Sequence, residues 1–551
     1  QEVTITGSVH NVVLKENSEV LEEVVVTGYG TTKKRDVVTS VASVSAEQLK
    51  DIPVVSAAEA LQGKMAGVSV TTTEGSPDAD VKIRVRGGTS LTQSNDPLYI
   101  VDGFPVASIS DIAPTDIQSM DVLKDAAATA IYGAQGANGV IIITTKDADT
   151  DSEDKMTFNV SYTGFVGWKS IAKKYDVMDP EDFALMQYEW AYHKDNTLSA
   201  MRSNFYAYFD KLYNDTKYKD PNEIENSTIS DILAEYADAS KHEFIDWQDN
   251  TFGRTGFNSN QSVSVSGGNK KANFTLSYNR IDDKAIMEQS NYVRNNISGK
   301  AKFKPFKNFT IGFTTRFTNT EVLGSGSNAI KDNGTSTESR LRNCVVYTPT
   351  TLLSKSDGSL EEEDETFGSL YDPLTTIRDN YKLKMDKKWN IQGYMSYKFA
   401  KHFTARVDLG YQSRHISTDR YYGPTTYFAR NTGRPGIEGG TAQLQVTDEY
   451  STVLTNHNTL EWKQTFENDH NVSVLVGEET VIRKGETKNQ YGFGYKGSYD
   501  VLNGEIFNYL GQAAYSEFTN YVDPRDNQLS FLARANYDYK GRYYITATFR
   551  A

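Results

Sequence analysis

From residue 156 onward the chain alternates polar and apolar side chains, and this period of two restricts what it can fold into. In residues 156–168, aromatic and aliphatic side chains share one face of an extended strand, and Thr, Asn and Ser share the other. A helix would group residues three and four apart, so it would not separate these two sets. The pattern predicts a strand between lipid and a wet lumen, as in the wall of a transmembrane β-barrel.

Similar alternation recurs along the chain, and the connections between the segments are alternately tight and long. Barrels of the outer membrane have short turns at one end and long loops at the other, so we expect every tight turn at the end where the chain enters the wall. The expected strands are the eleven segments 156–168, 258–266, 271–280, 292–303, 309–318, 389–399, 403–411, 454–466, 472–480, 531–539 and 543–549. The expected long loops are 169–257, 321–388, 413–450 and 482–527.

The composition agrees with a barrel and excludes several other classes of protein. The 551-residue chain has a net charge of −14, which argues against nucleic acid as a partner. Its mean hydropathy is −0.55, and no apolar run is long enough for a transmembrane helix. The single cysteine, Cys344, excludes an internal disulfide framework. The 34 Tyr and 25 Phe suit the aromatic girdles of a barrel, although a carbohydrate-binding β-protein would also have many.

Residues 31–146 contain a dense series of motifs that resembles a known domain. The motifs are VTSV (38–41), AEALQGK (58–64), AGV (66–68), IRVRG (83–87), PLYIVDG (97–103), SMDVLKDAA (119–127), IYG (131–133) and ANGVIIITTK (137–146). Together they resemble the plug domain of TonB-dependent outer-membrane transporters of the SusC/RagA family. The resemblance implies an all-β transmembrane barrel of 22 strands, about 11 of them in this chain, with an N-terminal α+β plug domain in the lumen.

An apolar, strand-forming run precedes the plug-like segment and is flanked by acids and glycines. A free run of this kind can add to the sheet edge of a partner protein, or it can be an ordinary edge strand. The resemblance identifies it as the TonB box, formed by Glu23, Val24, Val25, Val26 and Thr27. The expected organisation is an extension remnant (1–20), the TonB box (21–30), the plug domain (31–146), a linker (147–155) and the N-terminal half of the barrel (156–551).

Both ends of the chain depart from the family. Residues 3–9 and 11–20 resemble the first and last strands of a carboxypeptidase-regulatory-like extension, without the body between them. Two strands cannot form a β-sandwich, so we expect residues 1–20 to be a flexible lead. An antiparallel barrel cannot close on eleven strands without a parallel seam, so we expect the chain to end inside the barrel.

Two sets of plug residues are candidates for contacts. Arg84 and Arg86 alternate with apolar residues, so a strand would place both on one face, where they would pair with carboxylates of the wall or face solvent. The polar loop that follows contains Ser90, Gln93 and Asn95. Their hydroxyl and amide groups suit neutral hydrogen bonds to a substrate, and the alternative is a loop without ligand contacts.

The sequence gives little support to catalytic or metal chemistry. The seven histidines include no pair at helical ligand spacing, so we expect no catalytic metal and no cofactor. Asp147, Asp149 and Asp151 alternate as in a calcium loop, but the turn glycine and the bidentate glutamate are missing, and a solvated linker is the other reading. Loop aromatics such as Trp190 and Trp247 are either sugar-stacking platforms or packing residues.

The resemblance implies TonB-dependent import of a large nutrient across the outer membrane, without catalysis of a reaction. The nutrient would be an oligosaccharide or, alternatively, a peptide. TonB with ExbB/ExbD, a SusD-like surface lipoprotein, outer-membrane lipids and a paired transporter–lipoprotein assembly are the implied partners. The motifs disfavour a siderophore or cobalamin receptor. A signal-transducing receptor would need a signalling domain before the TonB box, and a surface glycan-binding protein would have no use for a plug.

Overall fold

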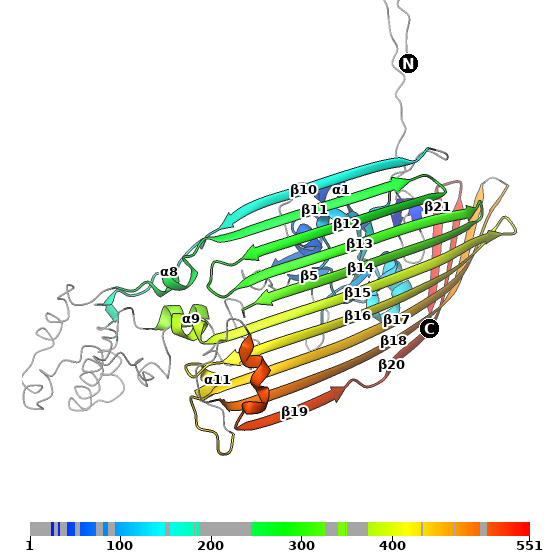
Figure 1. Ribbon diagram of the computed structural model, residues 1–551. Coiled ribbons are helices and arrows are strands. Elements are labelled where there is room, and N and C mark those ends of the chain that lie inside the picture. Colours follow the sequence, from blue (N-terminus) through cyan, green and yellow to red (C-terminus); the bar gives the residue numbers. More distant parts are fainter. Residues whose placement is uncertain are drawn as a thin grey trace, which may run out of the picture.

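The structure is a computed structural model, and its larger part is a curved antiparallel sheet that wraps round a smaller α/β domain (Figure 1). We call the sheet of residues 157–550 the wall, and the domain of residues 41–148 the plug. The structure describes residues 24–26, 31–33, 41–49, 56–72, 81–85, 87, 94–148, 155–180, 182–183, 186, 244–324, 340–347, 349, 373–430, 434–467, 469–495 and 504–551.

The strands of the wall follow one another in the order of the sequence, each antiparallel to its neighbours. All eleven predicted strands are present, and one further strand, β19, pairs with β18. The strands are β10 (Thr157–Lys169), β11 (Gly256–Gly268), β12 (Ala272–Lys284), β13 (Asn291–Phe306), β14 (Phe309–Leu323), β15 (Asn380–Phe399), β16 (Phe403–Tyr422), β17 (Ala442–Phe466), β18 (His470–Tyr495), β19 (Tyr515–Val522), β20 (Asp526–Tyr539) and β21 (Tyr543–Arg550).

Several strands are longer than predicted, and the longest extensions lie at the end away from the tight turns. The prediction for β15 began at residue 389 and the strand begins at Asn380, while β18 continues to Tyr495 instead of residue 480. The predicted loops 413–450 and 482–527 are therefore too long. In the β18 extension both faces carry polar residues, so the alternation that marks a strand in lipid is lost there. The β15 extension does alternate, with Tyr381, Leu383 and Met385 on one face, and was nevertheless assigned to a loop.

The missed strand β19 lies in line with β20 along the same neighbour, β18. On β18, Glu486 pairs with Val522 of β19, and Arg483 pairs with Asp526 of β20. The chain therefore advances three residues along β18 but four residues from β19 to β20. One extra residue is thus accommodated as a bulge beside Pro524, which lacks the N–H that a regular ladder needs. The bulge divides what is otherwise one long strand.

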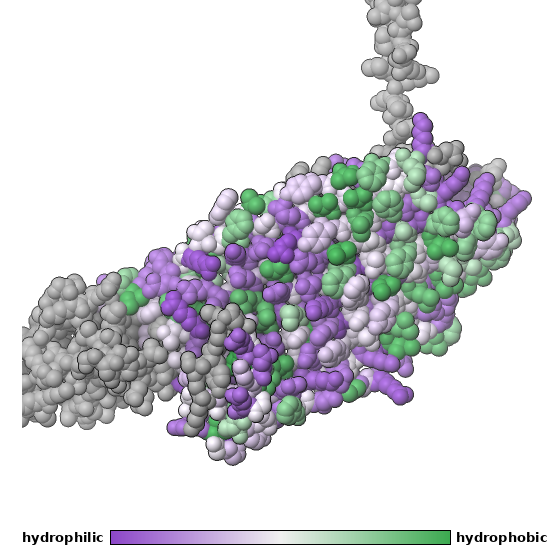
Figure 2. Space-filling view, viewed as in Figure 1, coloured by the Kyte–Doolittle hydropathy of each residue, from purple (hydrophilic) through white to green (hydrophobic). Residues whose placement is uncertain are grey.

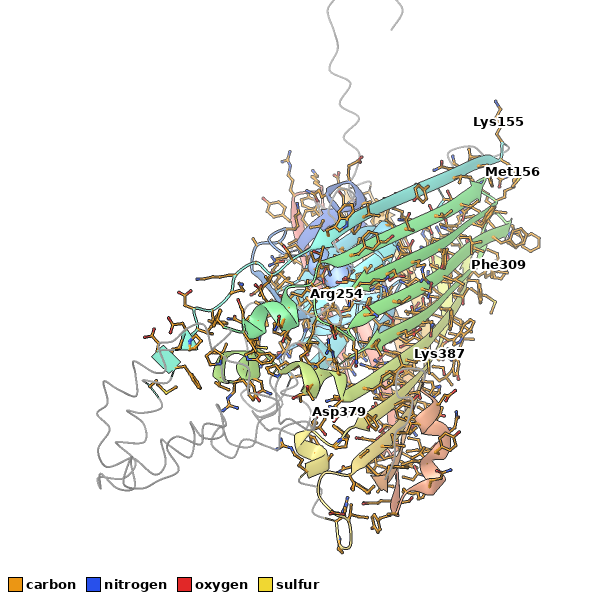
Figure 3. The ribbon with its side chains drawn as sticks, turned by 60° about the vertical axis from the view of Figure 1, so that its left-hand side comes forward. Lys155, Met156, Arg254, Phe309, Asp379 and Lys387 are labelled. Carbon is orange, nitrogen blue, oxygen red and sulfur yellow. The ribbon has the colours of Figure 1, made fainter. Side chains whose placement is uncertain are left out.

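The tight turns lie at one end of the wall, as predicted. Ala400 and Lys401 have φ values of 46° and 61°, and Lys540 and Gly541 have 55° and 63°, the left-handed conformation of two-residue hairpin turns. Thr157, the first residue of β10, pairs with the last residue of β11 beside such a turn. In Figure 3, Lys155, Met156 and Phe309 mark this end, and Arg254 and Asp379 mark the loop end.

The outer face of the wall exposes large apolar side chains in the half nearer the tight turns (Figure 2). Alternate residues along each strand form this apolar band, while the residues between them face the plug. Its exposed members are Phe158, Val160, Tyr162, Val263, Phe274, Leu276, Tyr278, Ile297, Phe303, Ile311, Phe313, Trp389, Ile391, Met395, Tyr397, Val407, Leu409, Tyr411, Leu454, Leu460, Val476, Leu529 and Phe531.

Short helices cover the loop end of β10–β15. They are α8 (Trp247–Phe252), α9 (Arg340–Val346) and α10 (Pro373–Arg378), and they share a core with Met287 of the β12–β13 connection. Trp247 packs on this core, and its ring lies edge-on to Tyr347 with centroids 5.5 Å apart. Its packing role is thereby confirmed, whereas Trp190 lies outside the described residues.

Two further helical segments lie at the loop end of β15–β19, α11 (Tyr427–Arg430) and η8 (Glu505–Gln512). The η8 segment, orange-red in Figure 1, crosses the outer face and buries Tyr381, Tyr421 and Leu444. Tyr381 is eight residues from Trp389 on the bulge-free strand β15, so the two point to the same outer face. The η8 segment therefore covers an apolar stripe that lies beyond the apolar band.

The plug contains a five-stranded sheet in the order β3-β8-β9-β6-β7 and a separate two-stranded sheet, β4-β5. The central strand β9 has the sequence VIIITT and is buried along most of its length, as a strand covered on both faces should be. The elements are β3 (Val41–Ser45), α1 (Ala46–Leu49), α2 (Ala57–Ala60), β4 (Val68–Thr72), β5 (Val81–Val85), β6 (Leu98–Val101), β7 (Phe104–Val106), η2 (Pro114–Asp116), β8 (Ile117–Leu123), α3 (Ala126–Thr129), η3 (Ala130–Gly136) and β9 (Val140–Thr145).

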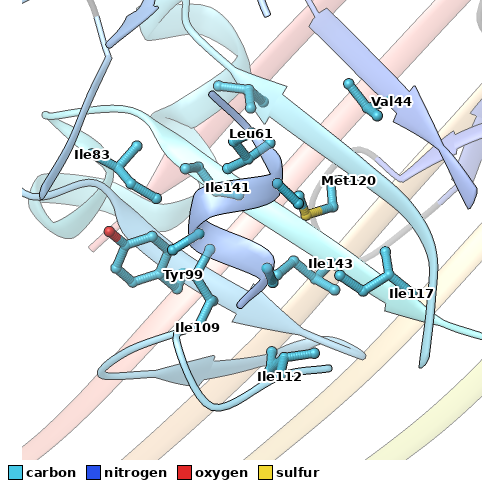
Figure 4. Close-up of a cluster of buried hydrophobic side chains, with 14 of the residues drawn as sticks. Val44, Leu61, Ile83, Tyr99, Ile109, Ile112, Ile117, Met120, Ile141 and Ile143 are labelled. Carbon is cyan, nitrogen blue, oxygen red and sulfur yellow. The ribbon is translucent and has the colours of Figure 1, made fainter. Parts of the chain in front are cut away.

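The core of the plug lies between its sheet and helix α2. Side chains from Leu61, Ile83, Met120 and Ile141 converge there (Figure 4), and all four are fully buried. Burying each such side chain contributes about 1.5–3 kcal/mol, so the plug holds a compact core of its own beside the wall.

Upstream of the plug, β1 (Val24–Val26) pairs antiparallel with β2 (Thr31–Lys33). The predicted extension, residues 1–20, lies outside the described residues. Among the residues that the structure describes, no helix is long and apolar enough to cross a membrane.

Candidate functional site

The interface between plug and wall concentrates charged and polar contacts, beginning with the β6–β7 turn. Asp102 and Gly103 have φ values of 50° and 92°, the left-handed conformation of a two-residue hairpin turn. The Asp102 carboxylate accepts hydrogen bonds from the Thr145 backbone N–H (3.0 Å) and hydroxyl (2.7 Å) on β9. These bonds hold the carboxylate at the edge of the plug, with 9% of its side chain exposed.

Two cations of the wall meet this carboxylate. Lys300 Nζ on β13 lies 3.6 Å from Asp102 Oδ1, and Arg316 Nη2 on β14 lies 4.0 Å from Oδ2. The Lys300 ammonium group also pairs with Asp147 Oδ1 at 2.7 Å and donates a hydrogen bond to the Thr145 carbonyl at 3.1 Å. Lys300 therefore joins the turn and the C-terminal end of the plug to one strand of the wall.

A second carboxylate, Asp111, enters a cationic part of the wall. Its Oδ2 lies 3.3 Å from Lys388 Nζ, and its carbonyl accepts from Asn296 Nδ2 at 2.6 Å. Arg294, which is 1% exposed, donates to the neighbouring carbonyl of Ser110. Burial acts to raise the pKa of Asp111, but Lys388, Arg316 and Arg294 outweigh it and hold that pKa below its ordinary value.

At Asp116, which lies nearby, the effect of burial on the pKa outweighs that of the neighbouring charges. Burial raises the pKa of Asp116 above its ordinary value, although a hydrogen bond with Ser277 and the charge of Arg316 oppose this. Next to it, the hydroxyls of Thr115 and of Ser262 on β11 are 3.0 Å apart. The plug loop 109–116 thus meets wall strands β11 to β15.

An aromatic contact anchors β7 on β16 and β17. The ring of Phe104 stacks on His457, with centroids 5.5 Å apart and planes 16° from parallel. A Cβ atom on Gly410 would lie 2.6 Å from the same ring, so glycine leaves the space that Phe104 fills. Gln412 Nε2 donates to the Pro105 carbonyl at 2.6 Å. Three plug residues of this turn, Asp102, Phe104 and Pro105, therefore contact the wall.

A separate contact joins the η3 segment to the last strands. Arg550 Nη1 donates to the Ile131 carbonyl at 2.9 Å, and its Nη2 pairs with Glu479 at 2.6 Å, with both side chains 8% exposed. Leu532 of β20 is buried in the same cluster as Ile131 and Tyr132. The plug is thus fixed to the wall on β11–β17 and on β18–β21.

The ion pairs described at this interface do not involve the predicted plug arginines. Carboxylates belong to the plug and cations to the wall, whereas arginines of the plug were expected to meet carboxylates. Arg84 is exposed on β5, because Ile83 and Val85 on the other face take the buried positions, and no ion pair joins it to any residue that the structure describes. Its contact with a wall carboxylate stays a prediction, and Arg86 lies outside the described residues.

The other predicted contacts are only partly within the described part of the chain. Ser90 and Gln93 lie outside it, and Asn95 is half-buried. The end of that loop is held by Asn138, whose Nδ2 donates to the Ser94 carbonyl at 3.1 Å. The substrate contacts stay a prediction.

The possible calcium site is reduced to one described member. Asp149 and Asp151 lie outside the described residues, and Asp147 is engaged by Lys300. No group of three His, Cys, Asp or Glu side chains within the described residues could hold a metal ion. The calcium site stays a prediction.

Three of the proposed TonB-box residues, Val24, Val25 and Val26, form β1 and pair with β2. The run is therefore paired within the chain, instead of free as its sequence suggested. Glu23 and Thr27 lie outside the described residues, and the role of the run stays a prediction.

The contact residues of the wall were missed by the sequence analysis, although a signal for them exists. Lys300, Arg316 and Lys388 occupy the wet face of predicted strands or their extensions, and Asp102 precedes a glycine in a plug motif, a pair typical of turns. Cations at lumen-facing positions, taken with carboxylates in plug turns, would have indicated the interface. The pairing itself depends on how the plug is oriented, which local pattern does not specify.

Comparison with known proteins places this arrangement in a family. The model of the TonB-dependent Receptor Plug Domain matches residues 33–140. TonB-dependent receptor P39 of Formosa agariphila is 30% identical over 556 residues, covering 100% of this chain and 47% of that protein. TonB-dependent receptor SusC of Bacteroides thetaiotaomicron is 34% identical over 303 residues, covering 53% of this chain and 26% of that protein. The chain is therefore similar to TonB-dependent receptors of the SusC type, and its residues 33–140 match their plug domain.

A solved structure of similar fold agrees with this assignment. The RagAB peptide importer in its open-open state aligns with a TM-score of 0.69 at 24% identity, covering 96% of this chain and 56% of that one. The chain spans about half the length of the curated relatives that match all of it. The domain around which the wall curves accordingly matches the TonB-dependent receptor plug domain, and the wall has the fold of the barrel wall in the solved structure.

Proposed function

We propose that the protein imports a large nutrient across the outer membrane, with energy supplied by TonB and ExbB/ExbD. The observation that carries this proposal is a hydrogen-bonded, ion-paired plug seated on the inner face of a wall whose outer face is apolar. A wall of this kind suits a bilayer on one side and a polar passage on the other. The plug blocks that passage, so import requires that it move, and the protein catalyses no reaction.

The contacts of the plug suit reversible displacement. Most of them are hydrogen bonds and ion pairs between polar surfaces, with apolar packing concentrated at Phe104 and Leu532. Water entering the interface can replace the polar contacts, because each neutral hydrogen bond contributes only about 0.5–1.5 kcal/mol net. The core between the plug sheet and α2 contains plug residues only, so the plug can separate from the wall while this core stays packed.

TonB would act through the β1–β2 hairpin. Two strands alone are marginally stable, so opening the hairpin to pair Val24–Val26 with a partner sheet requires little free energy. The SusC/RagA-type family also supports a SusD-like lipoprotein as partner and an assembly of paired transporters.

Deletion of residues 23–27 in the full-length protein tests this function. We expect growth on the cognate nutrient to stop, while expression and substrate binding are unchanged. Val25→Pro is a sharper variant, because proline removes the N–H of the strand, and Val25→Thr is its control because it keeps the β-branched shape. Normal uptake by the deletion variant would contradict the proposal.

The proposed nutrient is an oligosaccharide, as the family resemblance implies, and a peptide is the second candidate because the fold is similar to that of the RagAB peptide importer. The two are distinguished by calorimetry of the purified full-length protein with its lipoprotein partner. Binding of oligosaccharides but not of peptide mixtures of similar length is the expected result.

A further inference from the structure

A row of neutral polar side chains crosses the inner face of β17, β18 and β19 near the loop end. Gln445 Nε2 donates to the Thr447 hydroxyl at 3.3 Å, and that hydroxyl donates to Asn489 Oδ1 at 2.9 Å. Asn489 Nδ2 in turn donates to the Thr519 hydroxyl at 3.2 Å. The strand register explains this row, because Thr447 pairs with Asn489 and Asn489 pairs with Thr519.

Two tyrosines share the face of this row. Tyr491 follows Asn489 by two residues on β18, and Tyr521 follows Thr519 by two residues on β19. Tyr521 is 58% exposed, and the Tyr491 ring is stacked on Phe493 with planes 14° from parallel. We call Gln445, Thr447, Asn489, Tyr491, Thr519 and Tyr521 the lumen patch.

The lumen patch faces inward. On β17, Thr447 has the parity of His457, which stacks on Phe104 of the plug. On β18, Asn489 has the parity of Glu479, which lies 3.1 Å from His457. The register of the two strands is regular over this range, and alternate residues of a strand share a face. The patch therefore lies on the face of the wall that carries the plug.

The lumen patch lies beyond the plug, toward the loop end of the wall. Asp111 of the plug meets the wall at Lys388, which pairs with Arg414 on β16. Thr418 is four residues nearer the loop end of β16, and it pairs with Thr447 of the patch. At about 3.4 Å per residue, the patch begins roughly 14 Å along the strands from the Asp111 contact. A ligand that enters from the loop end would meet the patch before it meets the plug.

The chemistry of the lumen patch suits carbohydrate. A sugar ring presents C–H groups that pack on aromatic rings, and hydroxyls that both donate and accept hydrogen bonds. Within the described residues, the Tyr491 and Tyr521 hydroxyls and Gln445 Oε1 have no hydrogen-bond partner, and Asn489 Nδ2 uses one of its two hydrogens. These groups are available to a ligand.

The spacing of the two tyrosines suits an extended ligand. Tyr521 pairs with Thr487, which is four residues along β18 from Tyr491. About 14 Å of strand therefore separates the two tyrosine positions, and Asn489 and Thr519 lie between them. A chain of sugar rings could contact both tyrosines while its hydroxyls reach the polar row.

The charges at the border of the lumen patch favour a ligand without acidic groups. Arg434 pairs with Glu517 at 2.7 Å, and its guanidinium lies 5.0 Å from the centre of the Phe493 ring. Arg420 is stacked on a tyrosine ring of its own strand. Glu449 is exposed on the same face, where its carboxylate can accept bonds from sugar hydroxyls but repels an anion.

We infer that the lumen patch binds an uncharged segment of an oligosaccharide on its way to the plug. The inference rests on the proposed import of an oligosaccharide, and it deepens that proposal by assigning the ligand to a place on the wall. Tyr491 and Tyr521 pack against sugar rings, and the polar row between them binds the hydroxyls.

Calorimetry of the full-length protein with its lipoprotein partner tests the patch. The probes are hexasaccharides of glucose, mannose, galactose and xylose, a hexamer of galacturonic acid, and a peptide mixture of similar length. We expect at least one neutral hexasaccharide to bind. Tyr491→Ala and Thr447→Ala/Asn489→Ala should each weaken its binding about tenfold or more, the effect of losing an anchor at the centre of an interface. Tyr491→Phe keeps the ring and should lose less.

The matched controls lie on the same strands but on the outer face. Gln490 pairs with Phe518, which is 71% exposed, so Gln490→Ala and Phe518→Ala should leave the affinity unchanged. Heat-modified gel mobility verifies that each barrel is folded. Unchanged affinity in the patch variants, an equal loss in the controls, or no neutral hexasaccharide bound by the native protein would overturn the inference. Binding confined to the galacturonic acid hexamer or to the peptides would also overturn it.

The test of the patch and that of the proposed function can fail separately. Binding in solution requires no TonB, so unchanged affinity in the patch variants would leave TonB-dependent import intact. Normal uptake after deletion of residues 23–27 would contradict the proposed function, while a loss of affinity in Tyr491→Ala would still assign the ligand to the patch.

Discussion

Phe104 of the plug lies so close to Gly410 of the wall that a Cβ atom on the glycine would be 2.6 Å from the ring. The ring also stacks on His457, so it is held between two strands of the wall. The contact couples residues that are far apart in sequence, and it makes the absence of a side chain at residue 410 a requirement for seating the plug.

We predict that Gly410→Ala weakens the association of the plug with the wall by about 1–3 kcal/mol, the usual cost of overpacking a well-packed site. Hydrogen exchange of the β7 amides should become faster, and Phe104→Leu should partly restore protection. Gly393→Ala is the matched control, because its nearest atom would be 3.7 Å away. Unchanged exchange in Gly410→Ala would show that the ring moves aside without cost.

Removal of the Lys300 ammonium should loosen the C-terminal end of the plug. Lys300→Met leaves Asp102 and Asp147 without this cation, and a partner removed from a buried ion pair costs about 3–5 kcal/mol. We expect a loss of stability at the lower end of this range, because the Lys300 side chain is 21% exposed. The Thr145 amide, which donates to Asp102, reports the loss by hydrogen exchange. Equal effects of Lys300→Met and Lys302→Met would contradict the assignment.

Asp111 and Asp116 should respond to acid in opposite directions. The pKa of Asp111 is depressed in the folded protein, so its stabilising contribution is present above its ordinary pKa and is lost as pH falls through the folded value. The pKa of Asp116 is raised, so its ionised form opposes seating as pH rises through that value. At neutral pH, Asp111→Asn should therefore increase proteolysis of the plug, and Asp116→Asn should decrease it. The same sign for both variants would refute this balance of charges.

Cys344 should not react with thiol reagents in the folded protein. Burial raises its pKa to about 11, with Thr251 hydrogen-bonded to the sulfur at 3.3 Å. At pH 8 a maleimide should label it only after denaturation. Rapid labelling of the native protein would mean that the core beneath α8 and α9 opens readily.

The sequence predicted the wall well wherever lipid imposes a pattern. Residues 389–399 and 472–480 alternate because one face is apolar and the other wet, and both segments are strands. The end of β15 was missed although Tyr381, Leu383 and Met385 still alternate there with polar residues. The end of β18 was assigned to a loop because the alternation is lost beyond the apolar band. The β19 strand was missed for the same reason and because Pro524 interrupts the pattern.

The candidate site was less predictable, because its contacts join distant parts of the chain. The Asp102–Gly103 turn follows from its residues, but its pairing with Lys300 and Arg316 depends on the orientation of the plug. Arg84 was singled out because it stands on a regular strand, while the wall cations appeared to be ordinary wet-face residues. Alternation identifies which face is polar but does not identify the partner of each charge.

The central claim is that the plug must leave its seat in the wall for a nutrient to pass. Thr115→Cys/Ser262→Cys tests it most directly, because the two native hydroxyl oxygens are 3.0 Å apart across the interface. In a Cys344→Ser background of the full-length protein, we expect the oxidised variant to bind the nutrient normally but to lose uptake, and reduction to restore uptake. Each single cysteine variant is the control. Full uptake with the disulfide formed would contradict the account.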